Sequence, residues 1–396
     1  MSSEPPAGFA AHNEDVARVW QRYREREPER VPMILGLSVR YTLFNNDANP
    51  QGYSFRDYFE DPRVMYEHQL QHQWWVRHHL VQDAEMGPAQ EYTVSVDLQN
   101  SYEALWFGCP LEYRDGQCPD TVPLLTDDRK WSIFERGAPD PFHDGGWLER
   151  AWEYLEYFRE RAASDEFRGG RVKAGHVPGA GTDGPLTVAC SLRGATEAML
   201  DMYTDPDYYF RLMEFIVEAT ITRIRAYRAR LGQPVESTAW GFADDSVQLV
   251  SVETYRRFVL PFHQRLVEEF GREGPNSIHL CGHATHLFPT IRDELNVQSF
   301  DTGFPVDHGA LRRALGPEVE ILGGPHVELL RAGPPAAIEA EAKRILESGV
   351  TAGGRFVLRE GNNLAPGTPP EHVAVMYEAC KRWGPFDPHP YVASPW

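Results

Sequence analysis

The chain has little positive charge, few cysteines and no long apolar run. Its 39 lysine and arginine residues face 58 aspartate and glutamate residues, and the net charge of −19 argues against binding to nucleic acid or anionic membranes. No stretch approaches the roughly 18 consecutive apolar residues of a membrane span. Five cysteines in 396 residues are too few for a disulfide framework, so we expect reduced thiols. The polar, acidic start of the chain lacks the pattern of a secretory signal peptide, and we expect a cytoplasmic protein.

Apolar, strand-like segments alternate with helical patterns along most of the chain. The apolar content of 42% and charged content of 24% are typical of a globular protein, and the sequence shows neither an internal repeat nor a low-complexity tract. The segments are short and rich in Val, Ile, Leu and Phe, which predicts strands. They lie at Val31–Leu37, Tyr92–Asp97, Leu186–Cys190, Ser237–Phe242, Ser277–Cys281, Gln298–Asp301, Val319–Leu322 and Arg355–Leu358.

Strands that alternate with helices predict the α/β class and a (β/α)8 barrel, as one domain over residues 1–396. Residues 1–30 predict a helical extension, with a helix at about Glu14–Arg26. The glycine- and proline-rich stretch 99–184 predicts an excursion of loops and hairpins over one barrel mouth, after the second strand. Helical patterns lie at Asp205–Leu231, Ser251–Gly271, His286–Leu295, Asp307–Leu315, Pro334–Ser348 and Pro370–Trp383.

His279 and Cys281, in the run SIHLCGHATHLFPT, pair an imidazole with a thiol at the end of a predicted strand. Two residues apart on an extended strand, both side chains leave the same face and can reach one metal ion. Zinc suits such a nitrogen and sulfur donor set, and a site that keeps a labile position can activate an incoming atom. The alternative is a buried cysteine beside a hydrogen-bonded histidine.

Polar residues gather where the predicted strands end, and barrels place their chemistry at the carboxyl ends of strands. Asp301 is a third metal ligand, the acceptor that orients His279 through its second nitrogen, or the cap of a following turn. The Asp244–Asp245 pair contains a general base or a substrate anchor, or else serves the start of the next helix. The residues at these ends are Asp97, Asp244, Asp245, His279, Cys281, Asp301, His326, Glu360 and Asn362.

Two further features have structural interpretations. The loop AGHVPGAGTDGP, which contains His176 and Asp183, is rich in glycine, but its spacing matches neither nucleotide-binding motif. The predicted helix Asp205–Leu231 carries four arginines near its end, Arg223 among them. They indicate a helix face in contact with solvent.

Several sequence blocks occur in an informative order and spacing between about Asp15 and Gly384. They are GPLTVACSLRG, FADDSVQLVSVETYRRF, HLCGHATHLFPTIRDELNVQSFDTGFPVD, ALGPEVEILGGPHVELLRAGPP and GNNLAPGTPPEHVAVMYEAC. Together they resemble the uroporphyrinogen decarboxylase superfamily. That superfamily contains (β/α)8-barrel decarboxylases and zinc-dependent, corrinoid-linked methyltransferases, so the resemblance implies an enzyme on this barrel.

The methyltransferase branch of the superfamily has H-x-C-G on one strand, an acid at the next strand end and Gly-Cys after the last strand. The run from His279 to Gly282 is similar to the first element and Asp301 to the second. The third element is missing, because Gly361 is followed by Asn362. The resemblance implies Zn²⁺ as a cofactor, and Glu360 is the candidate that replaces the missing cysteine.

The decarboxylase branch resembles this chain less. Decarboxylases have Gly-His where Asn362 stands, and an arginine-rich segment near the N-terminus for substrate carboxylates. Here Arg40 alone follows the first predicted strand. Asp97 is similar to the family's active-site acid, and that acid alone does not make a decarboxylase.

The resemblance implies three candidate functions. In the first, zinc acts as a Lewis acid and a methyl group passes between a small substrate, such as a methoxylated aromatic compound, and a corrinoid (cobalamin) on a separate protein that docks at the mouth. O-demethylation is favoured, because a site with one thiolate fewer is more electrophilic. In the second, a lyase or decarboxylase acts on a smaller carboxylic acid without metal, through Asp97, Asp245 and His326. Arg40 and Asn362 are the candidate substrate-binding residues, and Asn362 is also a candidate for the fourth position on zinc. The third is a binding protein without catalysis. A homodimer is left open.

Overall fold

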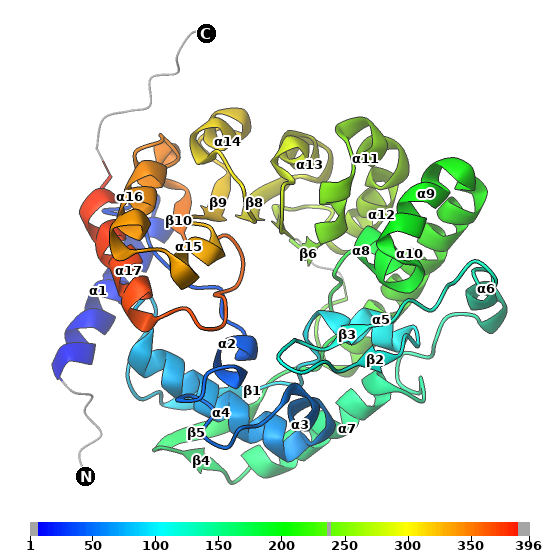
Figure 1. The fold of residues 1–396 in the computed structure, drawn as a ribbon, viewed down its shortest axis with the longest axis horizontal. Helices are drawn as coiled ribbons and strands as arrows, with labels where there is room; N and C mark the ends of the chain where they lie inside the picture. Colours follow the sequence, from blue (N-terminus) through cyan, green and yellow to red (C-terminus); the bar gives the residue numbers. More distant parts are fainter. Residues whose placement is uncertain (1–6, 236–238, 387–396) are drawn as a thin grey trace.

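Parallel strands line the inner side of the structure (Figure 1). The computed structural model describes residues 7–235 and 239–386. Five parallel strands form one sheet in the order β10-β9-β8-β7-β6, and a second sheet has the order β1-β5-β4, in which β4 runs antiparallel to β5. The strands are β1 (Glu91–Val94), β2 (Leu111–Glu112), β3 (Asp120–Thr121), β4 (Glu166–Phe167), β5 (Gly170–Ala174), β6 (Gly241–Ala243), β7 (Asn276–Leu280), β8 (Val297–Thr302), β9 (Glu320–Gly323) and β10 (Phe356–Leu358).

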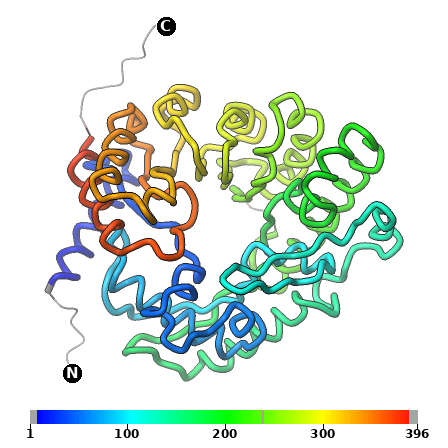
Figure 2. Tube along the Cα trace, viewed as in Figure 1, coloured from blue at the N-terminus to red at the C-terminus, as the bar shows by residue number. Residues whose placement is uncertain are grey.

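Helices surround the strands, and the elements follow one another around a ring in chain order (Figures 1 and 2). The α-helices are α1 (Ala7–Arg24), α2 (Val39–Leu43), α3 (Phe55–Glu60), α4 (Pro62–His79), α5 (Tyr102–Trp106), α6 (Ser132–Arg136), α7 (Trp147–Ala162), α8 (Pro185–Arg193), α9 (Ala195–Thr204), α10 (Pro206–Arg230), α11 (Val252–Phe258), α12 (Leu260–Phe270), α13 (Phe288–Leu295), α14 (His308–Leu315), α15 (Val327–Ala332), α16 (Pro335–Leu346) and α17 (Pro370–Trp383). Short 3-10 helices are η1 (Gln99–Ser101), η2 (Asp245–Leu249), η3 (Thr285–Leu287) and η4 (Ala352–Gly354).

Single contacts extend the two sheets toward each other. Met33 forms an isolated parallel bridge with Leu358 of β10, so the first predicted strand lies beside the last without forming a ladder. On the other side, the backbone N–H of Ala243 in β6 donates to the carbonyl of Thr182 in the loop after β5 over 3.4 Å. The hydrogen-bonded ladders of residues 7–235 and 239–386 therefore form arcs that these contacts connect.

Most sequence-based expectations for the strands are confirmed. Strands β1, β7, β8, β9 and β10 lie where the apolar segments predict them. The segment Ser237–Phe242 begins outside the described residues, and the strand found there is β6. The N-terminal helix and the six predicted helices are also present, with η3 ahead of α13 and a break between α11 and α12.

The predicted strand at Leu186–Cys190 is wrong, since these residues belong to helix α8. The third parallel strand is β5, which pairs with β1 along its length from Glu91↔Arg171 to Val94↔Ala174. Strand β5 lies inside the stretch 99–184 that the sequence assigns to loops and hairpins. The stretch also contains the β2-β3 hairpin and helix α7.

Helix α10 is more deeply buried than its arginines indicate. Arg223 is fully buried and forms an ion pair with Glu103 of α5 over 2.5 Å, so the prediction of a solvated face is wrong at this position. Among the described residues, none of the helices combines the length and hydropathy that a membrane span requires. All five cysteines are free thiols, as expected.

Candidate metal centre at the strand ends

The register of three neighbouring strands brings the candidate ligands together. Ala243 of β6 pairs with His279 of β7, and His279 pairs with Asp301 of β8. Within β7, exposure alternates: Ile278 and Leu280 are buried, while His279, on the opposite face of the strand, is partly exposed. Asp245 and Cys281 each lie two residues beyond the pair Ala243–His279, so the parallel register brings them side by side as well.

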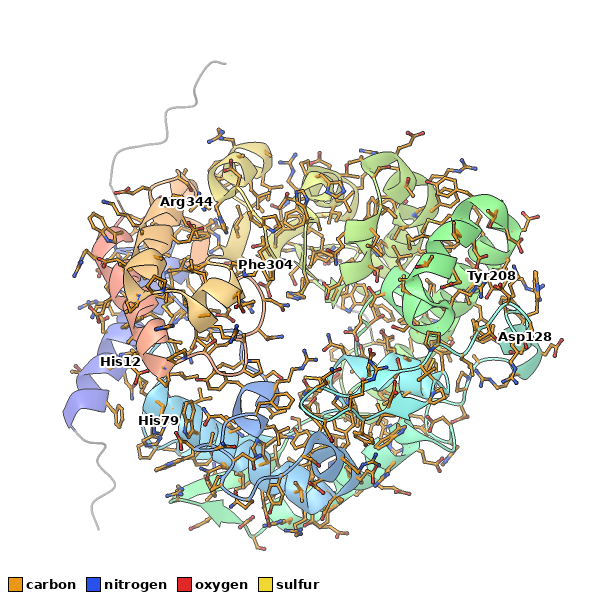
Figure 3. All side chains as sticks on the ribbon, in the orientation of Figure 1. His12, His79, Asp128, Tyr208, Phe304 and Arg344 are labelled. Atoms are coloured by element: carbon orange, nitrogen blue, oxygen red, sulfur yellow. The ribbon has the colours of Figure 1, made fainter. Side chains whose placement is uncertain are left out.

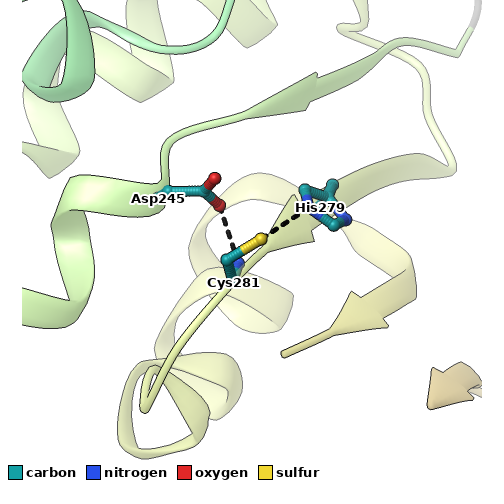
Figure 4. Close-up of side chains that lie close together, drawn as sticks. All are labelled: Asp245, His279 and Cys281. Carbon is teal, nitrogen blue, oxygen red and sulfur yellow. Dashed lines mark hydrogen bonds between the residues drawn. The ribbon is translucent and has the colours of Figure 1, made fainter. Parts of the chain in front are cut away.

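Asp245, His279 and Cys281 form a group whose potential ligand atoms all lie within 4.8 Å of one another (Figure 4). The Nε2 atom of His279 is 3.0 Å from the Sγ atom of Cys281, and the backbone N–H of Cys281 donates to Asp245 Oδ1 over 2.7 Å. It is the one such group of three among residues 7–235 and 239–386. The structure therefore brings Asp245, predicted as catalytic, to the two predicted ligands.

Glycine residues let the backbone turn tightly around Cys281. Gly282 has φ +69°, and a Cβ there would lie 1.8 Å from the side-chain oxygen of Gln248. A Cβ on Gly303 would lie 2.2 Å from the backbone nitrogen of Gly282. Only glycine meets both conditions without displacing the chain, which explains why the thiol is followed directly by glycine.

Hydrogen bonds control the electrostatics of this group. Burial opposes the protonation of His279, but its hydrogen bonds with Asp301 and Cys281 outweigh that effect and raise the pKa to about 10. Burial raises the pKa of the Cys281 thiol, against the lowering effect of His279. A bound cation would reverse both directions, because it favours thiolate and neutral imidazole.

Asp301 lies on the far side of the imidazole from Cys281. Its Oδ2 atom accepts from His279 Nδ1 over 2.7 Å and from Arg359 Nη1 over 2.6 Å. This geometry matches the second of the three roles that the sequence leaves open, an acceptor that orients His279. The group of three ligand atoms does not include Asp301.

Glu360 is buried at the end of β10 and also stands outside the group of three. Its Oε1 atom accepts from the backbone N–H of Gly36 over 2.6 Å. Burial raises its pKa to about 8, against the lowering effect of the Arg359 guanidinium. The side chain is therefore mostly protonated at neutral pH in the absence of a bound cation.

Asp244, the neighbour of Asp245, anchors the first turn of helix α8. It is fully buried, and its carboxylate accepts hydrogen bonds from Leu186 N–H, the N–H and hydroxyl of Thr187 and His263 Nε2. The first two donors belong to the first turn of α8. Of the interpretations of this pair, helix-start electrostatics therefore applies to Asp244, although the helix is α8 rather than the one that follows it in the chain.

A cavity of about 640 Å³ lies at the ends of β1 and β5, and its lining does not include the group of three. Asp97 and Arg40 line it, with His72 of α4 and His176 after β5. Asp97 accepts from Tyr58 and Gln99, and burial raises its pKa. Arg40 donates through Nε to the side-chain oxygen of Gln99 over 2.7 Å.

The two remaining predicted residues have structural contacts. His326 is exposed, its Nδ1 accepts from the N–H of Glu328 at the start of α15, and its ring lies 3.7 Å from that of Phe304, centroid to centroid. Figure 3 labels Phe304 on the inner side of the ring of elements. The backbone carbonyl of Asn362 accepts from Arg359 Nη2 over 2.6 Å.

Sequence reasoning missed a second acidic group beside Asp245. Asp183 lies in the loop after β5, and burial together with the charges of Glu103 and Asp245 raises its pKa well above the ordinary value. Glu103 accepts from Thr182 and Arg223. The signal was available, because this loop follows the carboxyl end of a parallel strand, but it required the recognition of β5.

Comparison with known proteins identifies the family. The uroporphyrinogen decarboxylase (URO-D) family matches residues 13–383. The chain belongs to this family. This match confirms the family resemblance predicted from the sequence blocks. The matched residues include the ends of β6, β7 and β8.

Relatives within the URO-D family have two different activities. A methylated-thiol–coenzyme M methyltransferase of Methanosarcina mazei is 31% identical over 201 residues, 50% of this chain and 51% of that protein. A uroporphyrinogen decarboxylase of Pelobacter propionicus is 29% identical over 220 residues, 54% of this chain and 62% of that protein. Another, of Aromatoleum aromaticum, is 29% identical over 286 residues, 68% and 72% of the two chains. The matches to the first two relatives span less than two thirds of their length.

The fold has a counterpart among solved structures. A methyltransferase from Methanosarcina mazei superposes with a TM-score of 0.60 at 18% sequence identity, over 93% of this chain and 98% of that protein. At this identity the likeness shows the fold. The chain is thus a URO-D family protein of mixed α/β fold with a parallel sheet.

Proposed function

We propose that the protein is a zinc-dependent methyltransferase that moves a methyl group between a small substrate and a corrinoid. The observation that carries the proposal is the group Asp245, His279 and Cys281 at the carboxyl ends of β6 and β7. The methyltransferase relative and the methyltransferase fold neighbour support it. We also infer that the parallel strands form the wall of a (β/α)8 barrel, because catalytic groups collect at this end of such barrels.

The donor set fits zinc. Thiolate, imidazole and carboxylate are all ligands of this ion, and catalytic zinc sites keep three protein ligands and one exchangeable position. Bonds of about 2.0 Å to nitrogen and 2.3 Å to sulfur place neighbouring donors of a tetrahedral zinc about 3.5 Å apart. The 3.0 Å between His279 Nε2 and Cys281 Sγ is close to that spacing. Hence small side-chain movements suffice to admit the ion.

Each residue of this centre has a role that its position supports. Cys281 and His279 bind zinc through Sγ and Nε2, and Asp245 offers its carboxylate as the third donor. Asp301 holds the imidazole through Nδ1. When bound, zinc supplies Lewis acidity to a heteroatom of the substrate. With one thiolate among the ligands the site is comparatively electrophilic, which favours removal of an oxygen-bound methyl group.

The cavity at the ends of β1 and β5 suits a small molecule. Its volume of about 640 Å³ lies within the usual range for small-ligand pockets, roughly 300–1,000 Å³. Asp97, Arg40 and His176 supply polar contacts there, and Asn363 lines its edge toward β10. We assign the corrinoid to a separate carrier protein that meets this substrate at the mouth.

A metal-free lyase or decarboxylase is the second candidate, because several URO-D relatives are decarboxylases and Asp97 is a partly buried carboxyl in the cavity lining with a raised pKa. The two candidates depend on different residues. Cys281→Ala removes a zinc donor and leaves the cavity lining intact, whereas Asp97→Asn changes the cavity and leaves the donors intact. This pair of variants therefore separates them.

The test starts with metal analysis of protein purified without added zinc. We expect about one Zn²⁺ per chain in the wild type and in Asp97→Asn, and little in Cys281→Ala. Methyl transfer is then followed in the visible spectrum of cob(I)alamin with a panel of methoxylated aromatics and methylated thiols. A wild type without zinc, or a Cys281→Ala variant with full activity, would contradict the zinc mechanism.

A further inference from the structure

Arg359 connects the candidate metal centre with the loop after β10. Its side chain is 10% exposed. One guanidinium nitrogen, Nη1, donates to Asp301 Oδ2 over 2.6 Å, and the other, Nη2, donates to the backbone carbonyl of Asn362 over 2.6 Å. We propose that Arg359 is a positioning residue that fixes His279 through Asp301 and fixes the Gly361–Asn363 loop at the same time. The inference rests on the proposed zinc site.

Asp301 depends on Arg359 for its orientation. Its Oδ2 atom accepts from both Arg359 and His279, while its Oδ1 atom is buried and has no hydrogen-bond partner among the described residues. Arg359 is thus the second group, besides the imidazole, that holds this oxygen. Removal of the guanidinium leaves the carboxylate free to rotate about its own bond, and His279 loses a fixed acceptor.

The orientation of Asp301 decides which nitrogen of His279 faces the metal. A proton on Nδ1, held by the carboxylate, leaves the lone pair on Nε2, and Nε2 is the atom that points to Cys281 Sγ. A fixed acceptor behind a ligating histidine also increases its basicity. The chain Arg359–Asp301–His279–Cys281 therefore sets the direction and strength of one zinc donor.

Only a flat, two-ended cation fits the place that Arg359 occupies. A Cβ on Gly36 would lie 2.0 Å from Arg359 Nη2, so the guanidinium lies directly against the backbone there. Lysine has the charge but a single nitrogen on a flexible stem, so it lacks the planar fork whose two nitrogens bond Asp301 and the Asn362 carbonyl separately. The same guanidinium thereby couples the metal centre to the loop whose Asn363 lines the cavity.

Arg359→Lys tests the inference, with Arg30→Lys as the matched control. Arg30 is equally buried, at 11% exposed, and pairs with Asp83 far from the centre. Zinc affinity is measured by competition with a chromophoric chelator, the ligand geometry by the visible spectrum of the Co²⁺-substituted protein, and stability by thermal unfolding. We expect Arg359→Lys to lower zinc affinity by about 10- to 100-fold and to change the Co²⁺ spectrum. Arg30→Lys should lower stability and leave both metal readouts unchanged.

Asp301→Asn serves as a second variant, because it keeps the shape of the side chain and its effect does not depend on how well Arg359→Lys folds. Loss of zinc affinity in this variant supports the step from Asp301 to His279, and an affinity equal to that of the wild type contradicts it. If the wild type binds zinc and both variants bind it equally well, the inference is overturned and the proposed function stands. A wild type that takes up neither Zn²⁺ nor Co²⁺ overturns the proposed function and the inference together.

Discussion

Asp244 and Asp245 are adjacent in the chain, and we expect opposite phenotypes when each is changed to asparagine. The carboxylate of Asp244 is fully buried and accepts from Leu186 N–H, Thr187 N–H, Thr187 Oγ1 and His263 Nε2 over 2.7–3.0 Å. Asp245 is partly exposed and accepts from the backbone N–H of Cys281. The first aspartate therefore anchors helix α8, while the second belongs to the candidate metal centre.

The magnitudes follow from these contacts. Asparagine at position 244 keeps one acceptor oxygen and turns an NH₂ group toward donors of α8, and a hydrogen bond to a charged group is worth about 1.5–3 kcal/mol. Since such bonds are not additive, we expect Asp244→Asn to lower the free energy of unfolding by roughly 3–5 kcal/mol. Asparagine at position 245 can still accept from Cys281, so Asp245→Asn should cost no more than about 1 kcal/mol. It removes a charged donor and should strongly weaken zinc binding.

The assay combines denaturant unfolding, followed by circular dichroism, with zinc content after dialysis. Asp244→Asn should show a clearly lower midpoint and bind zinc at low temperature, where it remains folded. Asp245→Asn should unfold like the wild type and retain little zinc. A stable Asp244→Asn protein would refute the reasoning about α8, and normal zinc content in Asp245→Asn would refute the assignment of the third donor.

Three further predictions use the same methods. Gly282→Ala should lower zinc affinity and stability, whereas Gly116→Ala, at a similar φ of +70° with no atom within 4 Å, should cost about 1 kcal/mol and leave zinc affinity unchanged. Burial raises the pKa of Glu360 from 4.5 to about 8, so between about pH 5 and 8 the folded protein holds a proton that the unfolded chain releases. The free energy of unfolding therefore falls as the pH rises through this range, and Glu360→Gln should make that fall smaller. Arg223→Met should lower the free energy of unfolding by about 3–5 kcal/mol, because it leaves Glu103 buried without its cation; equal midpoints would contradict this.

The sequence was sufficient to predict which strand ends meet at the candidate centre. Apolar runs mark where β7 and β8 end, and in a parallel sheet these ends lie side by side. His279 and Asp301 are therefore neighbours in register, as the sequence predicts. The period of two along a strand then brings Cys281 to the face of His279. These relations depend on local patterns, which a single sequence contains.

The third strand could not be found in this way. Strand β5 has the sequence GRVKA, in which Arg171 and Lys173 point to solvent, so its apolar signal is limited to two side chains. Residues 186–190, LTVAC, contain β-branched residues that favour a strand over five positions. Six residues of α8 are buried, and four of them, Pro185, Val188, Ala189 and Leu192, have the helical spacing of three, four and seven, so a longer window shows the helix. In the folded protein, the hydrogen bonds of Asp244 with Leu186 and Thr187 also stabilise the start of this helix.

The roles of acids in the centre depend on contacts that no sequence pattern contains. Asp301 becomes an orienting group because Arg359, 58 residues away in the chain, donates to the same oxygen that His279 reaches. Glu360 is kept protonated by its burial, which outweighs the opposite effect on its pKa of the hydrogen bond from Gly36, 324 residues away. Both side chains have the chemistry of a metal ligand. Arg359 holds Asp301 beside the imidazole, burial keeps Glu360 protonated, and Asp245 is left as the carboxylate beside the thiol.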